Sequence, residues 1–172
     1  MRVDLKYHTI NVRLAGIDAP EMAHFGHAPQ PFAPEAKEWL ARLVQGRRVR
    51  IQLHRIDQYG RAVASVWVRR RRWPHVLWPR WWNVSLAMVT DGFATLYRDA
   101  GAEYGGIKPL LEAAETRARA LRLGMWAQPP HQYQSPSAFK RQNRLQAALS
   151  STTTTTTTTA DGYFSHKQAV AA

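Results

Sequence analysis

The chain has 172 residues, 45% of them hydrophobic, which is enough for one core-forming domain and excludes a wholly disordered protein. Lys and Arg number 24 against 12 Asp and Glu, and the resulting formal charge of +12 favours polyanionic partners, nucleic acid first and anionic membrane surfaces second. The absence of cysteine excludes a disulfide scaffold, a thiolate zinc site and a cysteine nucleophile. No run approaches the roughly 18 apolar residues of a membrane span, and the start has no signal-peptide pattern, so we expect a soluble chain.

The first third of the chain predicts a strand, a loop and a helix. Residues 10–14 alternate between apolar and polar side chains, the period of a strand with one buried face. Pro20 cannot donate to a sheet ladder, so Asp18 and Glu21 are expected at the exit of that strand. A helix is predicted from Pro34 to Gly46, and we assign its apolar stripe to the core: Ala36, Trp39, Leu40, Leu43 and Val44.

The middle of the chain predicts a hairpin and then helices. Strands at 49–53 and 63–68 are joined by turn residues at 57–60. A short helix starts at Asn83 and ends at Asp91-Gly92, with a strand at 93–97 after it. A longer helix, about 107–122, is expected to bury one face and to end at Gly124, after which Met125-Trp126 folds back on the core; the inward residues are Leu110, Leu111, Ala114, Ala118 and Leu121.

This order predicts an α+β domain over residues 1–127, a small barrel flanked by helices, for which an OB-like barrel is one of several candidates. Residues 128–172 are predicted to be a basic, low-complexity and largely disordered tail. Within that tail a short basic helix is expected at 137–149, and the threonine run at 152–159 is expected to be disordered.

Four charged residues carry the candidate chemistry. The guanidinium forks of Arg13 and Arg61 can each grip phosphate oxygens in a bidentate way. Of the carboxylates Asp18 and Glu21, one can hold a hard divalent cation and the other can take a proton from water. Taken singly, each of the four is more often a turn or surface residue, so composition and spacing leave catalysis the minority interpretation.

The motifs themselves show a resemblance. The segments Arg13-Leu-Ala-Gly-Ile-Asp18-Ala-Pro-Glu21 and Asp57-Gln-Tyr-Gly-Arg61 resemble the two signature segments of the staphylococcal-nuclease-like (thermonuclease) family. Gly92-Phe-Ala-Thr-Leu96 and Leu123-Gly-Met-Trp126 follow the same pattern. Pro29-Gln-Pro-Phe32 is most similar to the fungal branch of endonucleases anchored in the mitochondrial membrane.

The resemblance implies a five-stranded OB barrel with packed helices and calcium-dependent endonucleolytic hydrolysis of DNA or RNA. Arg13 and Arg61 match the two catalytic arginines, which stabilise the pentavalent phosphate, and Glu21 matches the general base. Asp18 matches a ligand of Ca²⁺, and the backbone carbonyl of Ala19 occupies a position that can face the metal. Placement at the mitochondrial membrane is implied by the fungal resemblance alone.

One departure from the family pattern lies upstream of Arg13. The family has a second calcium-binding aspartate there, whereas the twelve residues before Arg13 contain only Asp4, in a context that does not match. We therefore expect an N-terminally truncated copy lacking the first barrel strands and the membrane anchor. The rival to a nuclease is a catalytically impaired, nucleic-acid-binding remnant, because one carboxylate holds calcium weakly.

A second departure is an Arg/Trp-rich insertion at 69–82. Arg69, Arg70, Arg71, Arg72 and Trp73 are candidate nucleic-acid contacts, since arginines can track phosphates while aromatic rings stack on bases. The same composition suits a peripheral membrane loop or a partly packed hairpin, and all three interpretations stay open. His24 and His27 have a metal-ligand spacing, but loop histidines without cysteine or a nearby acid rarely hold zinc.

Overall fold

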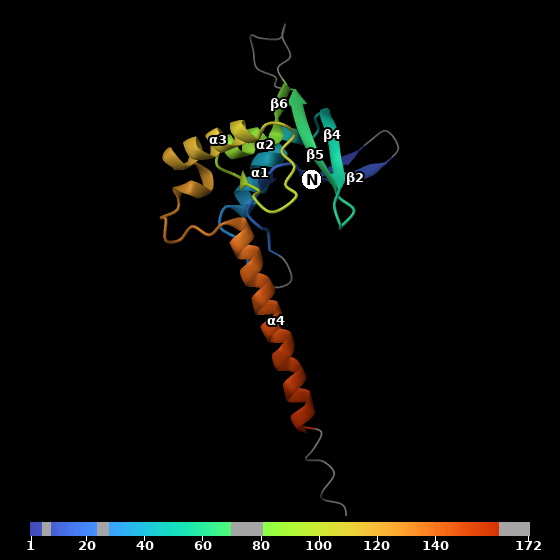
Figure 1. Ribbon diagram of the computed structural model, residues 1–172, viewed down its shortest axis with the longest axis vertical. Coiled ribbons are helices and arrows are strands. Elements are labelled where there is room, and N and C mark those ends of the chain that lie inside the picture. Colours follow the sequence, from blue (N-terminus) through green and yellow to red (C-terminus); the bar gives the residue numbers. More distant parts are fainter. Residues whose placement is uncertain (5–7, 24–27, 70–80, 162–172) are drawn as a thin grey trace, which may run out of the picture. The chain divides into compact units, whose positions relative to one another are not determined.

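The computed structural model describes residues 1–4, 8–23, 28–69 and 81–161, and the chain divides into two units, Met1–Pro136 and Ser137–Ala172. Figure 1 shows the elements along the chain. In order they are β1 (Arg2–Asp4), β2 (Thr9–Leu14), β3 (Ile17–Asp18), α1 (Ala33–Val44), β4 (Val49–Ile56), β5 (Ala62–Arg69), β6 (Trp81–Asn83), α2 (Val84–Thr90), β7 (Thr95–Leu96), α3 (Lys108–Ala120), the 3₁₀ helix η1 (Gly124–Ala127) and α4 (Pro136–Asp161).

The first unit is built on a mixed five-stranded sheet in the order β1-β2-β5-β4, with β6 pairing the far end of β5. The hairpin β4–β5 is antiparallel, as predicted, whereas β2 runs parallel to β5 and joins segments about 50 residues apart. A separate ladder pairs β3 with β7. Within the described residues β1 and β4 end the strand order, so these strands do not close into a barrel.

The inner face of the sheet forms one apolar cluster. Alternate residues of β5, from Ala62 to Val68, point to it and are buried together with Val12 of β2 and Val84 of α2. Half-buried side chains from α1 and β4, among them Leu40 and Ile51, cover the same cluster. The period-two alternation of β5 therefore sends its odd-numbered residues to the opposite, outer face of the sheet.

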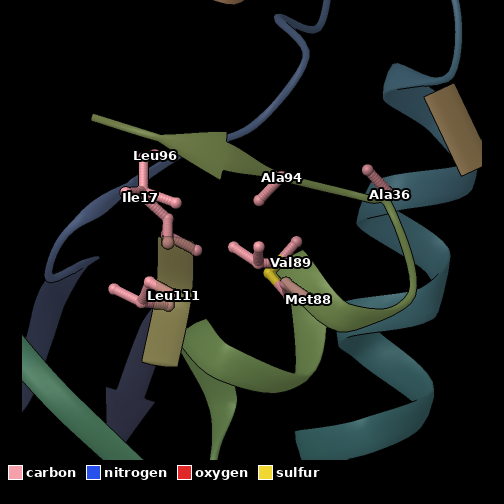
Figure 2. Close-up of a cluster of buried hydrophobic side chains, with 7 residues drawn as sticks. All are labelled: Ile17, Ala36, Met88, Val89, Ala94, Leu96 and Leu111. Carbon is pink, nitrogen blue, oxygen red and sulfur yellow. The ribbon is translucent and has the colours of Figure 1, made fainter. Parts of the chain in front are cut away.

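A second apolar cluster lies between the helices and the small β3–β7 ladder (Figure 2). Ile17 and Leu96 come from the ladder, Met88 and Val89 from α2, and Leu111 from α3, with Ala36 and Ala94 beside them. Burial of a side chain such as Met88 or Leu111 contributes about 1.5–3 kcal/mol. This cluster fixes α2 and α3 against the strand that carries Asp18.

The predicted core stripe of α1 is confirmed, whereas that of α3 is partly wrong. On α1 Ala36 is buried, and the larger side chains of the stripe are half-buried against the two clusters; the indole of Trp39 also donates to Asp91 Oδ2 at 3.1 Å. On α3 the expected inward residues Leu110 and Leu121 are each 56% exposed. The buried face of α3 is formed by Leu111, Glu115 and Ala118. Because this face contains a carboxylate, the apolar residues alone predicted a face that is rotated away from the buried one.

The two segments Gly92–Leu96 and Leu123–Trp126, which follow the family pattern, contact each other at their glycines. Gly92 has φ of +75° and a Cβ at this position would overlap the carbonyl of Leu123. Gly124, with φ of +51°, approaches the carbonyl of Gly92 equally closely, and the amide of Met125 donates to that carbonyl at 2.9 Å. As predicted, η1 folds back and buries Met125. Only residues without a side chain permit this backbone crossing.

The first unit extends beyond the domain end predicted at residue 127. Tyr133 stacks on Trp126 with ring centroids 4.5 Å apart, and burial raises the pKa of the Tyr133 phenol to about 12. The carbonyl of Gln134 accepts a hydrogen bond from Gln30 Nε2 at 2.7 Å. These contacts hold the segment after η1 on the core.

The second unit contains most of α4. A helix was predicted at 137–149, but α4 continues through the threonine run, where composition predicted disorder. Threonine has a low helix propensity, so the intrinsic preference of the run does not account for this helix. Among the described residues no helix has the length and apolarity needed to cross a membrane.

Candidate functional site

The two predicted phosphate-binding arginines lie on neighbouring strands. Arg13 on β2 is in register with Val63 of β5, and Arg61 immediately precedes β5. With strands about 4.8 Å apart and a rise of about 3.3 Å per residue, the backbones of the two arginines are about 8 Å apart. Both positions have the parity of the outer face, so the parallel pairing gathers two guanidiniums on one side of the sheet.

Arg61 is held by the turn before it. Asp57 Oδ1 accepts the backbone amides of Tyr59 and Arg61, each at 2.9 Å, and Asp57 Oδ2 accepts Arg61 Nε at 2.8 Å. Burial raises the pKa of Asp57, but these hydrogen bonds outweigh it and hold the pKa below its ordinary value. Because the bond to Asp57 uses Nε, the terminal nitrogens of the Arg61 guanidinium have no carboxylate partner among the described ion pairs.

Arg13 is positioned by an aromatic ring. Its guanidinium carbon lies 4.6 Å from the centroid of Tyr97, a cation–π contact. The carbonyl of Tyr97 accepts the hydroxyl of Tyr104 at 2.6 Å, and its amide donates to the carbonyl of Gly16 at 3.1 Å. A guanidinium stacked in this way keeps its edge nitrogens available for hydrogen bonds to an anion.

Asp18 lies on β3, which leaves β2 through a tight turn. Gly16 forms this turn with φ of +75°, and a Cβ there would crowd Tyr104 at 2.9 Å and Leu111 at 3.1 Å. The register pairs Asp18 with Thr95 of β7, and Asp18 is only 9% exposed. The strand exit predicted for this carboxylate is therefore a two-residue strand of its own.

Glu21 follows β3 and is held through its main chain. Its carbonyl accepts the amide of Gln30 at 2.8 Å, and its amide donates to Gln30 Oε1 at 3.2 Å. Gln30 is 5% exposed, and its Nε2 binds the carbonyl of Gln134. One buried amide side chain thus joins the candidate general base to the end of the unit, a role that the sequence pattern did not reveal.

The amino end of the chain lies beside the arginine pair. The Met1 ammonium donates to the carbonyl of Val12 at 2.9 Å. Burial, and then repulsion from Arg61, lower the pKa of this ammonium.

A buried carboxylate behind the site was also missed by the sequence interpretation. Glu115 of α3 is 3% exposed; it accepts the amide of Leu96 at 3.1 Å and forms ion pairs with Arg98 and Arg119. The hydrogen bond to Glu115 raises the pKa of the Arg98 guanidinium above its ordinary value. Glu115 thereby ties α3 to β7, the strand that pairs with Asp18. The sequence signal that could have identified Glu115 is its position: it lies four residues after Leu111 and three before Ala118, on the buried side of α3.

The described residues provide an incomplete ligand set for calcium. Calcium takes about six to eight oxygen ligands, and no group of three or more His, Cys, Asp or Glu side chains comes together among the described residues. Asp18 is the carboxylate that the motif provides. The protein atoms described therefore do not by themselves make a calcium site.

Other predicted site residues lie at or beyond the limits of the described chain. Arg69 is exposed at the end of β5. Arg70, Arg71, Arg72 and Trp73 of the insertion fall outside the described residues, as do His24 and His27.

Comparison with known proteins identifies relatives of this domain. A family model described as staphylococcal nuclease homologue matches residues 11–128. "Probable endonuclease lcl3" of Pyrenophora tritici-repentis is 46% identical over 129 residues, 74% of this chain and 45% of that protein. The protein of the same name from Sclerotinia sclerotiorum is 44% identical over 147 residues, 85% of this chain and 53% of that one.

The chain thus spans about half the length of the curated relatives that it matches. The family match and the mixed sheet with its helices confirm the predicted α+β, OB-type fold class, although the described strands do not close. The match includes all four candidate residues, from Arg13 to Arg61, together with the two glycine motifs that cross behind them. The chain belongs to the family of staphylococcal nuclease homologues, in its fungal branch.

Proposed function

We propose that this domain hydrolyses phosphodiester bonds within DNA or RNA in a calcium-dependent reaction. The observation that carries the proposal is the parallel pairing of β2 with β5, which brings Arg13 and Arg61 together on the outer face of the sheet. Membership of a nuclease family and relatives that are named as endonucleases support the same chemistry. The net charge of +12 favours a polyanionic substrate.

In this proposal the residues divide the chemistry. Arg13 and Arg61 bind the scissile phosphate with their terminal nitrogens and stabilise the charge that grows on it. The carboxylate of Glu21 takes a proton from the attacking water, a general-base contribution of about 10²–10⁴-fold. Asp18 would be the residue that holds calcium, and the bound ion would supply neutralisation of phosphate charge.

A non-hydrolytic alternative rests on the single carboxylate at β3. If one protein ligand is too few to retain calcium, the domain binds nucleic acid through its arginines without cutting it. The two functions differ in calcium binding: calcium titrated into protein already saturated with a non-cleavable oligonucleotide yields a heat of binding only if the ion is retained.

The test is cleavage of circular single-stranded DNA, with calcium and then with EDTA. We expect opening of the circle with calcium, loss in EDTA, and a fall of about 10²-fold or more for Glu21→Gln. Glu35→Gln, which removes an exposed carboxylate on α1, is the matched control and retains activity. Cleavage by Glu21→Gln at the wild-type rate contradicts the assigned general base, and binding without cleavage establishes the alternative.

We separately propose that the protein is located at the mitochondrial membrane, and this proposal is supported by the fungal resemblance alone. Fractionation of fungal cells that express the tagged protein tests it.

A further inference from the structure

The outer face of the sheet continues past the site toward the other end of β5. On this face the register places Arg50 of β4 opposite Trp67 of β5, and Arg69 of β5 opposite Trp81 of β6. Arg48 directly precedes β4 and has the same parity as Arg50. We call these five residues the Arg/Trp face: Arg48, Arg50, Trp67, Arg69 and Trp81.

The chemistry of the Arg/Trp face is cationic and aromatic. Arg48, Arg50 and Arg69 are exposed, and none of them belongs to an ion pair among the described residues. The guanidinium carbon of Arg50 lies 4.7 Å from the ring centroid of Trp81, which is itself 38% exposed. The stacked arginine is thus held in place while its edge stays open to an anion.

The Arg/Trp face shares its strand with the candidate site. Trp67 lies six residues beyond Arg61 on β5, a span of about 20 Å. Between them Val63 and Ser65 are buried. The Ser65 hydroxyl shares a hydrogen bond of 2.8 Å with His54 Nε2 and lies close to Gly105. Two exposed cationic regions therefore lie along one strand, separated by a covered stretch.

We propose that the Arg/Trp face is an accessory binding surface for single-stranded nucleic acid, which holds the substrate strand some distance from the scissile phosphate. The proposal rests on the proposed function for the identity of the strand. Single-strand binding combines a cationic track with aromatic platforms on which bases stack, and one OB fold covers about 4–16 nucleotides, enough to reach both regions.

An anionic membrane is the competing partner, and the composition of the face argues against it. Interfacial segments bury aliphatic and aromatic side chains among the acyl chains. The exposed positions of this face on and before β4, which are Arg48, Arg50 and Gln52, are all polar or cationic. The exposed Leu53 has the opposite parity, since it pairs with Ala64 of the inner face.

The test measures binding without cleavage. A labelled oligothymidylate of about 16 nucleotides and a labelled dinucleotide are titrated, without calcium, against the full chain carrying Glu21→Gln. The variants added to that background are Arg48→Ala/Arg50→Ala and Trp81→Ala, and Arg117→Ala, an exposed arginine of α3, is the matched control. Circular dichroism and melting confirm that each variant is folded.

We expect the double arginine variant to reduce the slope of log K against log salt by about 1.4, or 0.7 for each lost phosphate contact to a single strand. Trp81→Ala should weaken binding of the long oligonucleotide by about 5-fold or more, the loss of one stacked base. Binding of the dinucleotide should not change, and Arg117→Ala should behave like the background protein.

Unchanged affinity and unchanged salt slope in the folded double variant overturn the proposal. The proposal is also overturned if the face variants lose binding to vesicles of phosphatidylserine and phosphatidylcholine but still bind the oligonucleotide. That result would assign the Arg/Trp face to a membrane. The outcome is independent of catalysis: if the wild-type chain binds through this face but cuts nothing, hydrolysis fails and the surface stands. If it cuts and the face variants bind normally, the surface fails and hydrolysis stands.

Discussion

Replacement of Gln30 by methionine tests how the candidate general base is held. Methionine keeps the length and most of the volume of glutamine, but it can neither accept the Glu21 amide nor donate to the carbonyl of Gln134. The main-chain bond between the Gln30 amide and the Glu21 carbonyl remains in the variant. The substitution therefore loosens Glu21 while the arginines, on other strands, keep their supports.

The size of the effect follows from two hydrogen bonds in a buried place. A buried group that loses its partner costs about 1–3 kcal/mol. Since methionine also recovers some apolar burial, we expect the free energy of unfolding to fall by about 2–4 kcal/mol. A displacement of the base by about 1 Å lowers kcat by about 10²-fold, whereas KM should change little because the proposed phosphate ligands, Arg13 and Arg61, keep their supports.

Urea unfolding and steady-state cleavage of single-stranded DNA measure the two quantities. Gln128→Met is the control, because Gln128 Nε2 donates a single hydrogen bond to the carbonyl of Met125, away from Glu21. We expect this control to lose about 1 kcal/mol and to keep its kcat. The reasoning is refuted if Gln30→Met retains kcat within twofold of the wild type, or if the loss resides in KM instead.

Three further predictions concern stability and can share one set of unfolding measurements. Gly92→Ala should lower the free energy of unfolding by about 3–5 kcal/mol, because the residue has a positive φ and the new Cβ overlaps the carbonyl of Leu123. The control Gly46→Ala has a φ of +67° but no atom within 4 Å of the new Cβ, and it should cost about 1 kcal/mol. Equal losses would contradict the close approach of the two backbone segments. Asp57 has a lowered pKa, so its stabilisation is fully present above the ordinary value of 3.8 and is lost as the pH falls through the lowered value; the difference in unfolding free energy between wild type and Asp57→Asn should shrink in that acid range, and a constant difference would be inconsistent with the pKa. Glu115→Ala should lower the free energy of unfolding by about 3 kcal/mol, because the partners of the buried carboxylate lose their hydrogen bonds. The control Glu112→Ala removes an exposed carboxylate of the same helix and should cost below about 0.5 kcal/mol. Similar losses for the two variants would contradict the buried position of Glu115.

Strong local signals predicted most of the first unit. The alternation in β2, β4 and β5 located these strands, and the turn at 57–60 located their hairpin. The capping side chain of Asn83 accepts the amide of Leu86 at 3.0 Å, as its place before α2 indicated. These features depend on neighbours in sequence, which is why a period or a cap suffices to find them.

The misses depend on partners that are distant in sequence. The strands β1 and β3 are two or three residues long, too short for a period, and they form because β2 and β7 offer them a ladder. The strand predicted at 93–97 is reduced to β7, since Phe93 turns back to donate to the carbonyl of Met88 at 2.8 Å. On α3 a buried acid shifted the core stripe away from Leu110 and Leu121.

The candidate site divides in the same way. Motif resemblance identified Arg13, Asp18, Glu21 and Arg61, and their roles remain proposals. Their supports come from other segments: Gln30 contacts Glu21, Tyr97 contacts Arg13, and Glu115 holds β7, which pairs with the strand of Asp18. Spacing in the sequence identifies the residues that touch a substrate better than it identifies the residues that hold them.

The parallel pairing of β2 with β5 has a consequence for when the site can exist. Arg13 and its partner Val63 are 50 residues apart, and closing such a loop costs about 3.5 kcal/mol of chain entropy before any contact offsets it. Local pairings such as the β4–β5 hairpin are expected to form before pairings this distant in sequence, so we expect the two guanidiniums to come together late in folding. A chain still emerging from the ribosome would hold Arg13 without Arg61, so hydrolysis of nucleic acid, if it is this domain's activity, is confined to copies that have finished folding.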